Sequence, residues 1–359
     1  MCDGARYTVD VPPRLPLAPS ADAFVWADGV RVAGSDIHCD ASRCPAEATA
    51  FVSHARAPRL RGGADVRLVT TERTRLLRAV EVAPRGQAAA TLVTPFGRPF
   101  ALGRLRLELL PSGHAPGAAQ LYVELDGRRV GYCGPLNPLP SRFAEPAQVR
   151  AAEALCLHAP LAVYGRKLPP RAEAEAALAA AVGRALDEGA TPVVLASPPG
   201  AVEIVAQLVA AGLSLRLHAR LGAWLDGYAR CGLPLRAPEG AVRPFRGSPA
   251  RGEVVVWPLE ARHAPAIGRL RSARLLAATG AALDPDLPAK LRVDAAFALA
   301  VEGDLPSLVA HAEAAEARDV WLTSGYGDAA LRAFAAAGIR AHALEAHRAM
   351  QQMALFPDF

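Results

Sequence analysis

The chain has 359 residues, 52% of them hydrophobic and 21% charged, which is enough apolar material for a sizeable core and excludes an intrinsically disordered protein. Its net charge of +5 permits nucleic-acid binding without proving it, because the charge is almost all arginine and the chain is rich in alanine, a bias typical of a GC-rich genome. The six cysteines lack a disulfide-framework spacing, residues 1–6 lack the apolar core of a signal peptide, and no apolar run is long enough to cross a bilayer. We therefore expect a cytoplasmic protein without membrane contact.

The first part of the chain, up to about residue 160, is predicted to be rich in strands. Short apolar runs broken by Asp28-Gly29 and Gly34-Ser35 have hairpin spacing, and a further hairpin is expected across Asp126-Gly127. Residues 1 to about 22 are rich in proline and irregular, which predicts an edge strand or an arm. The expected strands are 24–26, 30–32, 37–39, a strand ending at 51–52, 66–69, 91–93, 100–102, 105–109, 119–125 and 129–133, with a helix at 72–80.

The second part alternates between helices and strands. Helices are predicted at 171–189, 201–211 and 221–231, and buried strands at 193–196, 213–217 and 252–257. This alternation indicates a parallel sheet with right-handed crossovers. Segments 297–299, 305–317, 320–322 and 329–337 predict one more βαβ unit with a following helix, and the chain is expected to end in a tail at 349–359.

The stretch 51–61 is the strongest candidate for a functional loop. Phe51 and Val52 end a buried strand, and Ser53 and His54 then turn into a loop, which is where α/β enzymes usually place their reactive groups. Beyond His54, however, arginines and a proline stand where further metal ligands could have been.

Several separated segments resemble one known family in the right order. Residues 111–120, with the sequence P-S-G-H-A-P-G-A-A-Q, are similar to the motif P-A-G-H-x-x-G-S-A-Q, and residues 129–134, 294–308 and 323–331 add further matches. These motifs are typical of the metallo-β-lactamase fold with a β-CASP insertion, and the chain looks most like the bacterial ligase-associated DNA exonucleases, relatives of RNA 3′-end processing nucleases.

The resemblance implies an α/β fold, a four-layer αββα sandwich with an inserted β-CASP α/β domain. It also implies domain boundaries: 1–165 for the first metallo-β-lactamase-like part, 166–290 for the insertion, 291–348 for the second metallo-β-lactamase-like part, and 349–359 for the tail.

Active members of this family hold two zinc ions with T-H-x-H-x-D-H, a later histidine and an aspartate after Y-S-G. The chain retains Asp40, His54 and His114 at family positions. The family positions that have lost their residue type are Arg56, Pro58, Arg59, Pro135, Leu161, Glu302 and Ser324. Guanidinium groups stay charged and cannot act as ligands, and proline supplies neither a ligand nor a backbone N–H. We therefore expect no catalytic residues, no metal and no cofactor, which makes the chain a predicted pseudoenzyme.

Two interpretations of the loop arginines remain open. Arg56, Arg59 and Arg61 could take the place of the lost metals and hold a DNA phosphate through bidentate contacts. Alternatively, they fill a dead pocket and pair with Asp40 or Glu302. His54 and His114 could still hold one metal weakly, although hydrogen bonding is the more common role of such a remaining pair.

The tail carries the clearest hint of a partner. Gln352, Leu355 and Phe356 resemble the bacterial sliding-clamp binding motif, in which two apolar anchors enter a hydrophobic pocket and the glutamine amide bonds at its edge. The alternative is an apolar tail that packs on its own domain.

Taken together, the sequence predicts an inactive nuclease relative that binds DNA single strands or ends in repair or replication and is recruited by the sliding clamp. Two alternatives are a nuclease with an altered or single-metal centre, and a scaffold that binds a partner such as a DNA ligase or polymerase without touching DNA.

Overall fold

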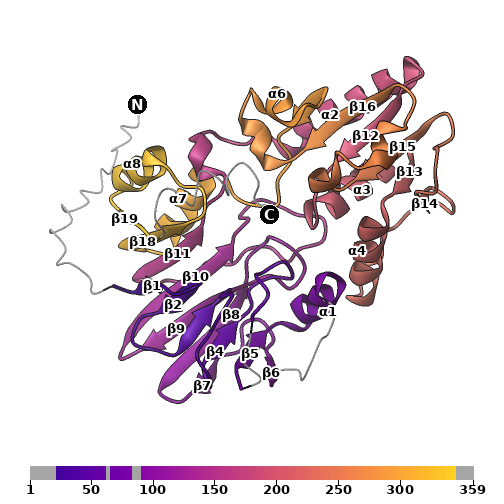
Figure 1. The fold of residues 1–359 in the computed structure, drawn as a ribbon. Coiled ribbons are helices and arrows are strands. Elements are labelled where there is room, and N and C mark those ends of the chain that lie inside the picture. Colours follow the sequence, from indigo (N-terminus) through magenta and orange to yellow (C-terminus); the bar gives the residue numbers. More distant parts are fainter. Residues whose placement is uncertain (1–21, 62–64, 83–89, 345–359) are drawn as a thin grey trace, which may run out of the picture.

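The computed structural model describes residues 22–61, 65–82 and 90–344, and these residues form a mixed α/β protein with three sheets arranged in two lobes (Figure 1). The α/β class expected from the sequence is confirmed. The N-terminal arm and the tail at 349–359 with Gln352, Leu355 and Phe356 lie outside the described residues, apart from residue 22. No helix in the described part is long and apolar enough to cross a membrane.

The first sheet begins as an antiparallel meander and continues as parallel strands, in the order β1-β2-β3-β4-β5-β6. The predicted hairpin at Asp28-Gly29 is confirmed, and Gly29 is required there because a side chain would lie 2.5 Å from the backbone of Ala41. The strands are β1 (Phe24–Trp26), β2 (Val30–Val32), β3 (Ile37–Cys39), β4 (Thr49–Phe51), β5 (Arg67–Thr70) and β6 (Thr91–Val93).

Between β5 and β6 the chain forms helix α1 (Glu72–Glu81), as the sequence predicts. Its first turn is capped by the Thr71 hydroxyl, which accepts a hydrogen bond from the Thr74 N–H at 3.2 Å. The predicted helix and its cap lie within a few residues of each other in the chain, so local sequence is sufficient to specify them.

The second sheet has the order β19-β18-β11-β10-β9-β8-β7. The strands from β7 to β10 are antiparallel, which confirms the hairpin at Asp126-Gly127, and those from β10 to β19 are parallel. The strands are β7 (Phe100–Leu102), β8 (Leu105–Pro111), β9 (Ala119–Leu125), β10 (Arg128–Pro135), β11 (Ala154–His158), β18 (Asp319–Thr323) and β19 (Arg340–Ala343).

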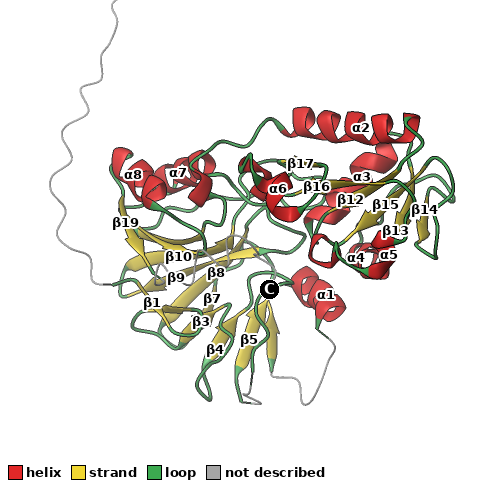
Figure 2. Cartoon of the chain, turned by 45° about the horizontal axis from the view of Figure 1, so that its top comes forward, coloured by secondary structure: helices red, strands yellow, loops and turns green. Residues whose placement is uncertain are grey.

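These two sheets pack face to face. Leu107 and Leu109 of β8 point into the same core as Phe24 and Phe51 of the first sheet, as the alternation of a half-buried strand requires. On its outer face the second sheet is covered by α7 (Leu305–Ala314) and α8 (Asp328–Ala336), whose buried side chains join a separate core (Figure 2). The first lobe is therefore a two-sheet sandwich whose second sheet carries α7 and α8 on its outer face.

The second lobe is inserted between β11 and β18 and is built on a parallel sheet of order β14-β13-β15-β12-β16-β17. Val254, Val255 and Val256 of β15 are all buried, because helices cover both faces of such a sheet. The strands are β12 (Thr191–Leu195), β13 (Ser214–Leu217), β14 (Val242–Pro244), β15 (Glu253–Trp257), β16 (Ala273–Ala278) and β17 (Ala295–Phe297). The helices are α2 (Arg171–Asp187), α3 (Gly200–Ala210), α4 (Ala219–Arg230), α5 (Pro265–Gly268) and α6 (Leu287–Leu291).

One predicted unit is wrong. The strand expected at 297–299 is β17 at 295–297, and it pairs with β16 of the second lobe, whereas β18 belongs to the first lobe. The two strands therefore cannot form a βαβ unit, and the sheet of the second lobe continues beyond the boundary expected at residue 290. A three-residue apolar run carries no signal of which sheet it joins, so only the fold reveals its partner.

Candidate binding site between the two lobes

The carboxyl ends of several strands of the first lobe meet at one place. Parallel pairing of β3 with β4 brings Asp40 beside the end of β4, where its N–H donates to the Phe51 carbonyl at 2.9 Å. Pro135 and His158 end β10 and β11 side by side in register. Loops at the carboxyl ends of parallel strands are the usual positions of binding sites in such sheets. Here they bring together residues that the sequence analysis considered separately.

Asp40 is held by a hydrogen-bond network. Its Oδ1 accepts from the Ser53 N–H at 2.8 Å, and its Oδ2 accepts from the Tyr132 hydroxyl at 2.9 Å and from the Ser53 hydroxyl. Burial raises the pKa of Asp40, while the bonds from Ser53 and Tyr132 oppose that rise. Gly134 makes room for this network, because a side chain there would lie 2.7 Å from the Ser53 Oγ. Both oxygens of the retained aspartate are thus already engaged.

The network fixes the tautomer of His54. Its Nδ1 lies 2.8 Å from the Ser53 Oγ, and the Ser53 hydroxyl already donates its hydrogen to Asp40. We therefore infer that His54 Nδ1 carries the hydrogen and donates it to Ser53, which leaves a lone pair on Nε2.

His114 is fixed in the same sense. Its Nδ1 lies 2.9 Å from the Val301 carbonyl, which can only accept, so this nitrogen carries the hydrogen and Nε2 has the lone pair. The rings of His54 and His114 are nearly perpendicular, with centroids 5.4 Å apart. The structure therefore brings together the two retained histidines.

His158 is a third member of this group, which we call the histidine cluster (His54, His114 and His158). A charge on His158 would lower the pKa of His54, and a charge on His114 would lower that of His158, whose Nδ1 is buried without a hydrogen-bond partner among the described residues. Burial lowers the pKa of His114 and of His158 to about 4 and that of His54 well below its usual value. All three are therefore neutral at pH 7, and their free lone pairs make them acceptors or metal-ligand types rather than cations.

The sequence analysis assigned no role to His158. The signal that could have found it is the one used for Ser53 and His54, a polar residue directly after a buried apolar strand. A single histidine offers no spacing pattern, however, and its neighbours in the cluster come from distant parts of the chain.

The loop that follows His54 is held by guanidinium groups. Arg56 donates from Nη1 to the Pro198 carbonyl of the second lobe at 2.7 Å. Arg78 of α1, which the sequence analysis did not single out, donates to the carbonyls of Ala57 at 2.6 Å and Pro58 at 2.8 Å. The loop is therefore stabilised by hydrogen bonds from arginine side chains to backbone carbonyls.

Arg59 and Arg61 lie at the exposed rim of the same loop. Their side chains have no ion pair with another described residue, whereas the backbone N–H of Arg61 donates to the Ser42 carbonyl at 2.8 Å. Of the three arginines considered for phosphate binding, Arg59 and Arg61 are thus accessible, and Arg56 is half-buried and connects the lobes.

The other family positions serve packing or backbone geometry. Pro58 is exposed, and Leu161 is buried in a small core with Leu168 and Leu283. Ser324 is buried and has a left-handed backbone with φ of 55°. Glu302 is half-buried and follows Val301, the partner of His114.

A charged network joins the lobes beside this loop. Glu81, at the end of α1, accepts from Arg220 of α4 at 2.9 Å and from the Trp224 Nε1 at 2.5 Å. Arg220 also pairs with Glu260, and Glu260 accepts from the Ser197 hydroxyl at 2.6 Å. We call these five residues the ionic network. It places the carboxyl edge of the sheet of the second lobe against the first lobe.

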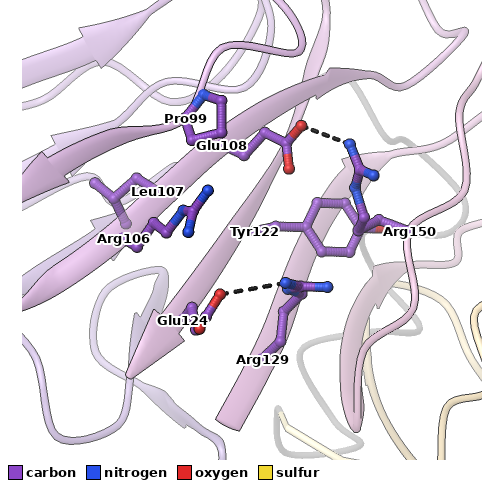
Figure 3. Close-up of a pocket in the computed structure, with 8 residues that line it drawn as sticks. All are labelled: Pro99, Arg106, Leu107, Glu108, Tyr122, Glu124, Arg129 and Arg150. Carbon is purple, nitrogen blue, oxygen red and sulfur yellow. Dashed lines mark hydrogen bonds and ion pairs between the residues drawn. The ribbon is translucent and has the colours of Figure 1, made fainter. Parts of the chain in front are cut away.

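A separate polar pocket lies on the sheet formed by β8, β9 and β10 (Figure 3). It has a volume of about 220 Å³, and its charged side chains pair with each other: Arg150 with Glu108 at 2.6 Å and Arg129 with Glu124 at 3.2 Å.

Within the described ranges, no group of three or more His, Cys, Asp or Glu side chains is arranged to hold a metal ion.

The comparisons with known proteins give limited information. No family model matches the chain. Over 258 residues, or 70% of this chain, it is 26% identical to a protein named "Probable DNA ligase" from Opitutus terrae (strain DSM 11246 / JCM 15787 / PB90-1), of which the match covers 25%. The chain thus spans about a quarter of the length of that curated relative.

A solved structure is also similar. The crystal structure of a protein of unknown function from Enterococcus faecalis V583 matches with a TM-score of 0.50 and 14% sequence identity, over 76% of this chain and 74% of that one. This likeness shows a shared α/β architecture and carries no information on activity.

Proposed function

We propose that the protein is a catalytically inactive relative of the metallo-β-lactamase/β-CASP nucleases that binds DNA in repair or replication. Three features support the family: two facing sheets, a candidate site at the strand ends, and a parallel α/β lobe inserted between β11 and β18. The match to part of a protein named "Probable DNA ligase" supports a role in DNA metabolism.

The proposed loss of activity is supported by the hydrogen bonds that hold the loop at residues 51–61 and the carboxylate of Asp40. Arg56 lies in this loop and Arg78 bonds to it, and both side chains are permanently charged. Both carboxylate oxygens of Asp40 accept hydrogen bonds, from Ser53 and Tyr132. A two-zinc centre needs several neutral imidazoles and carboxylates with free lone pairs. The residues present do not fit such a centre, so we derive no hydrolytic step.

DNA would contact the exposed rim of the loop. Arg59 and Arg61 offer guanidinium groups that can hold phosphates through paired hydrogen bonds. Arg56 would act as a positioning residue, because its bond to Pro198 holds the loop against the second lobe. We therefore propose phosphate contacts for Arg59 and Arg61, and not for Arg56.

The direct test is the double variant Arg59→Ala/Arg61→Ala, with the exposed Arg104→Ala as a control for lost charge. We expect the affinity for single-stranded DNA to fall about tenfold or more at low salt, because two phosphate contacts are lost. The control should bind nearly as tightly as the unmodified protein. Equal affinity of the double variant and the unmodified protein would reject this role of the rim.

Recruitment by the sliding clamp is a second part of the proposal, and it depends on Gln352, Leu355 and Phe356 outside the described residues. A pull-down of the clamp with the full chain and with a chain lacking residues 349–359 tests it. Retention of the clamp by the full chain alone is the expected result, and equal retention by both chains would contradict it. A DNA ligase or polymerase in the same pull-down would identify a further partner.

One observation favours a second candidate, a nuclease with a single metal. His54 and His114 are neutral, each has a lone pair on Nε2, and their ring centroids lie 5.4 Å apart. Near-stoichiometric zinc or manganese, together with DNA cleavage that His114→Gln abolishes, would favour this enzyme. Absence of any DNA binding in a gel shift would instead favour the interaction scaffold.

A further inference from the structure

A basic segment forms the outer edge of the second lobe. Residues 236–251 contain four arginines and a single acidic residue, Glu239. The segment includes β14, the edge strand that lies at the far end of the sheet in Figure 1. All four arginine side chains are exposed; they are Arg236, Arg243, Arg246 and Arg251. We call this surface the basic edge.

These arginines do not hold the fold together. None of the four has an ion pair with another residue in the described part of the chain, whereas Arg216 of the neighbouring strand β13 pairs with Glu253 at 2.8 Å. Glu253 also accepts from the Ala250 N–H at 2.6 Å, so its carboxylate is already engaged. The basic edge therefore has a net charge of +3 that the protein leaves facing solvent.

The backbone of the basic edge is fixed rather than loose. Leu215 donates to the Ala241 carbonyl at 2.7 Å, and Phe245 donates to the Leu217 carbonyl at 2.8 Å. The Phe245 ring packs edge-on against Trp257, with centroids 5.2 Å apart. Arg243 and Arg246 are consequently presented from a strand and its end at a defined spacing, which reduces the entropy cost of binding an extended ligand.

The chemistry of the basic edge fits a polyanion better than a protein surface. Protein interfaces depend on apolar and aromatic anchors, and no large apolar side chain of this segment is among the exposed ones of the described residues. Arginine forks without such anchors match phosphates, which carry most of the affinity in sequence-independent nucleic-acid binding.

We propose that the basic edge is a second nucleic-acid contact, which holds the phosphate backbone of a bound strand. This inference rests on the proposed DNA-binding function and extends it. No aromatic side chain of residues 236–251 is exposed for stacking on bases, so the contact would recognise charge and not sequence.

The test uses the full chain with Arg243→Gln, Arg246→Gln and Arg251→Gln combined. A matched variant removes the same charge from exposed positions elsewhere: Arg98→Gln, Arg318→Gln and Arg332→Gln. Affinity for labelled single-stranded and duplex DNA is measured between 50 and 200 mM salt. We expect the edge variant to bind at least tenfold more weakly at the lowest salt and its salt slope to fall by about 2 to 3, while the matched variant changes little.

The outcomes separate this inference from the function on which it rests. If the unmodified protein binds no DNA, the proposed function fails, and with it the basic edge. If it binds DNA and the edge variant has the same affinity and slope, only the basic edge is rejected. Unchanged affinity with new self-association in gel filtration would also reject it, because the arginines would then only protect an edge strand from pairing.

A second variant guards against a folding defect in the strand. Arg236→Gln/Arg251→Gln changes only positions outside β14, and it should lower the salt slope by about 1 to 2 if both side chains contact phosphates. An unaltered slope in this variant would argue against the basic edge in the same way.

Discussion

The two halves of the interlobe contact use polar groups in opposite ways. On one side the histidine cluster holds neutral imidazoles, with His54 held by Ser53 and His114 by the Val301 carbonyl. On the other side the ionic network holds full charges, with Arg220 between Glu81 and Glu260. Both lie at the carboxyl ends of parallel strands, yet one excludes charge and the other depends on it.

Because of this difference, we expect the histidine cluster and the ionic network to respond differently to pH and to salt. A neutral buried histidine is stable until protons are abundant, so the histidine cluster should respond to acid and little to salt. A partly buried ion pair should weaken in salt and respond little between pH 5 and 8. The lobes are therefore joined by two contacts that can be disturbed separately.

The largest expected effect is the loss of the central cation in the ionic network. Arg220→Leu leaves the largely buried carboxylates of Glu81 and Glu260 without their shared partner, and removing one member of such a partly buried ion-pair network is strongly destabilising. We expect the free energy of unfolding to fall by about 3 kcal/mol, measured by denaturant titration with tryptophan fluorescence. The exposed pair of Arg75 with Glu72 provides the control, and Arg75→Ala should cost less than about 0.5 kcal/mol. Equal losses of unfolding free energy in the two variants would contradict the expected difference between the ionic network and an exposed ion pair.

The next effect is acid destabilisation through the histidine cluster. The folded-state pKa of His114 and of His158 is about 4, below the unfolded value, so the unfolded chain takes up protons first as the pH falls. Stability is therefore full above about pH 6.5 and declines toward pH 4, by about 1.4 kcal/mol per pH unit for each histidine.

The variant His158→Gln measures how much of this acid destabilisation comes from His158. Between pH 6.5 and 5 it should lose about 2 kcal/mol less than the unmodified protein, whatever its stability at neutral pH. Unfolding curves recorded at several pH values measure this, and the difference should persist at high salt. Parallel pH dependences of the two proteins would show that His158 is not a buried neutral histidine.

The smallest expected effect is the loss of the hydrogen bond from Tyr132 to Asp40, which in turn is bonded to Ser53 beside His54. Tyr132→Phe removes the hydroxyl that donates to Asp40 at 2.9 Å. We expect a loss of about 1 kcal/mol in the free energy of unfolding and a further rise of the Asp40 pKa, because one bond to its charged form is gone. A thermal melt checks the first and carboxyl NMR titration the second; unchanged values in both would contradict this account of Asp40.

Local features of the fold could be predicted from the sequence. The hairpin at Asp126-Gly127 and helix α1 depend on neighbours within a few residues, and both are confirmed. Strand β17 was assigned to the wrong unit because its partner β16 is chosen by the fold, and β16 itself, rich in alanine, offers little strand signal.

The candidate site was predictable only in part. Asp40, His54 and Pro135 could be placed together by resemblance, since each ends or follows a recognisable strand. The pair of Arg220 with Glu81 joins residues 139 positions apart, and Arg78 contacts carbonyls that no side-chain pattern reveals. Contacts to backbone and contacts between lobes leave almost no trace in a single sequence.

The proposed function requires that this chain binds DNA and does not cut it. The most direct measurement incubates the purified full chain with end-labelled single-stranded and duplex DNA, with zinc or manganese added, and follows binding and strand length in the same samples. The account predicts a salt-sensitive complex with the label recovered at full length. Metal-dependent shortening of the label that His114→Gln abolishes would contradict it.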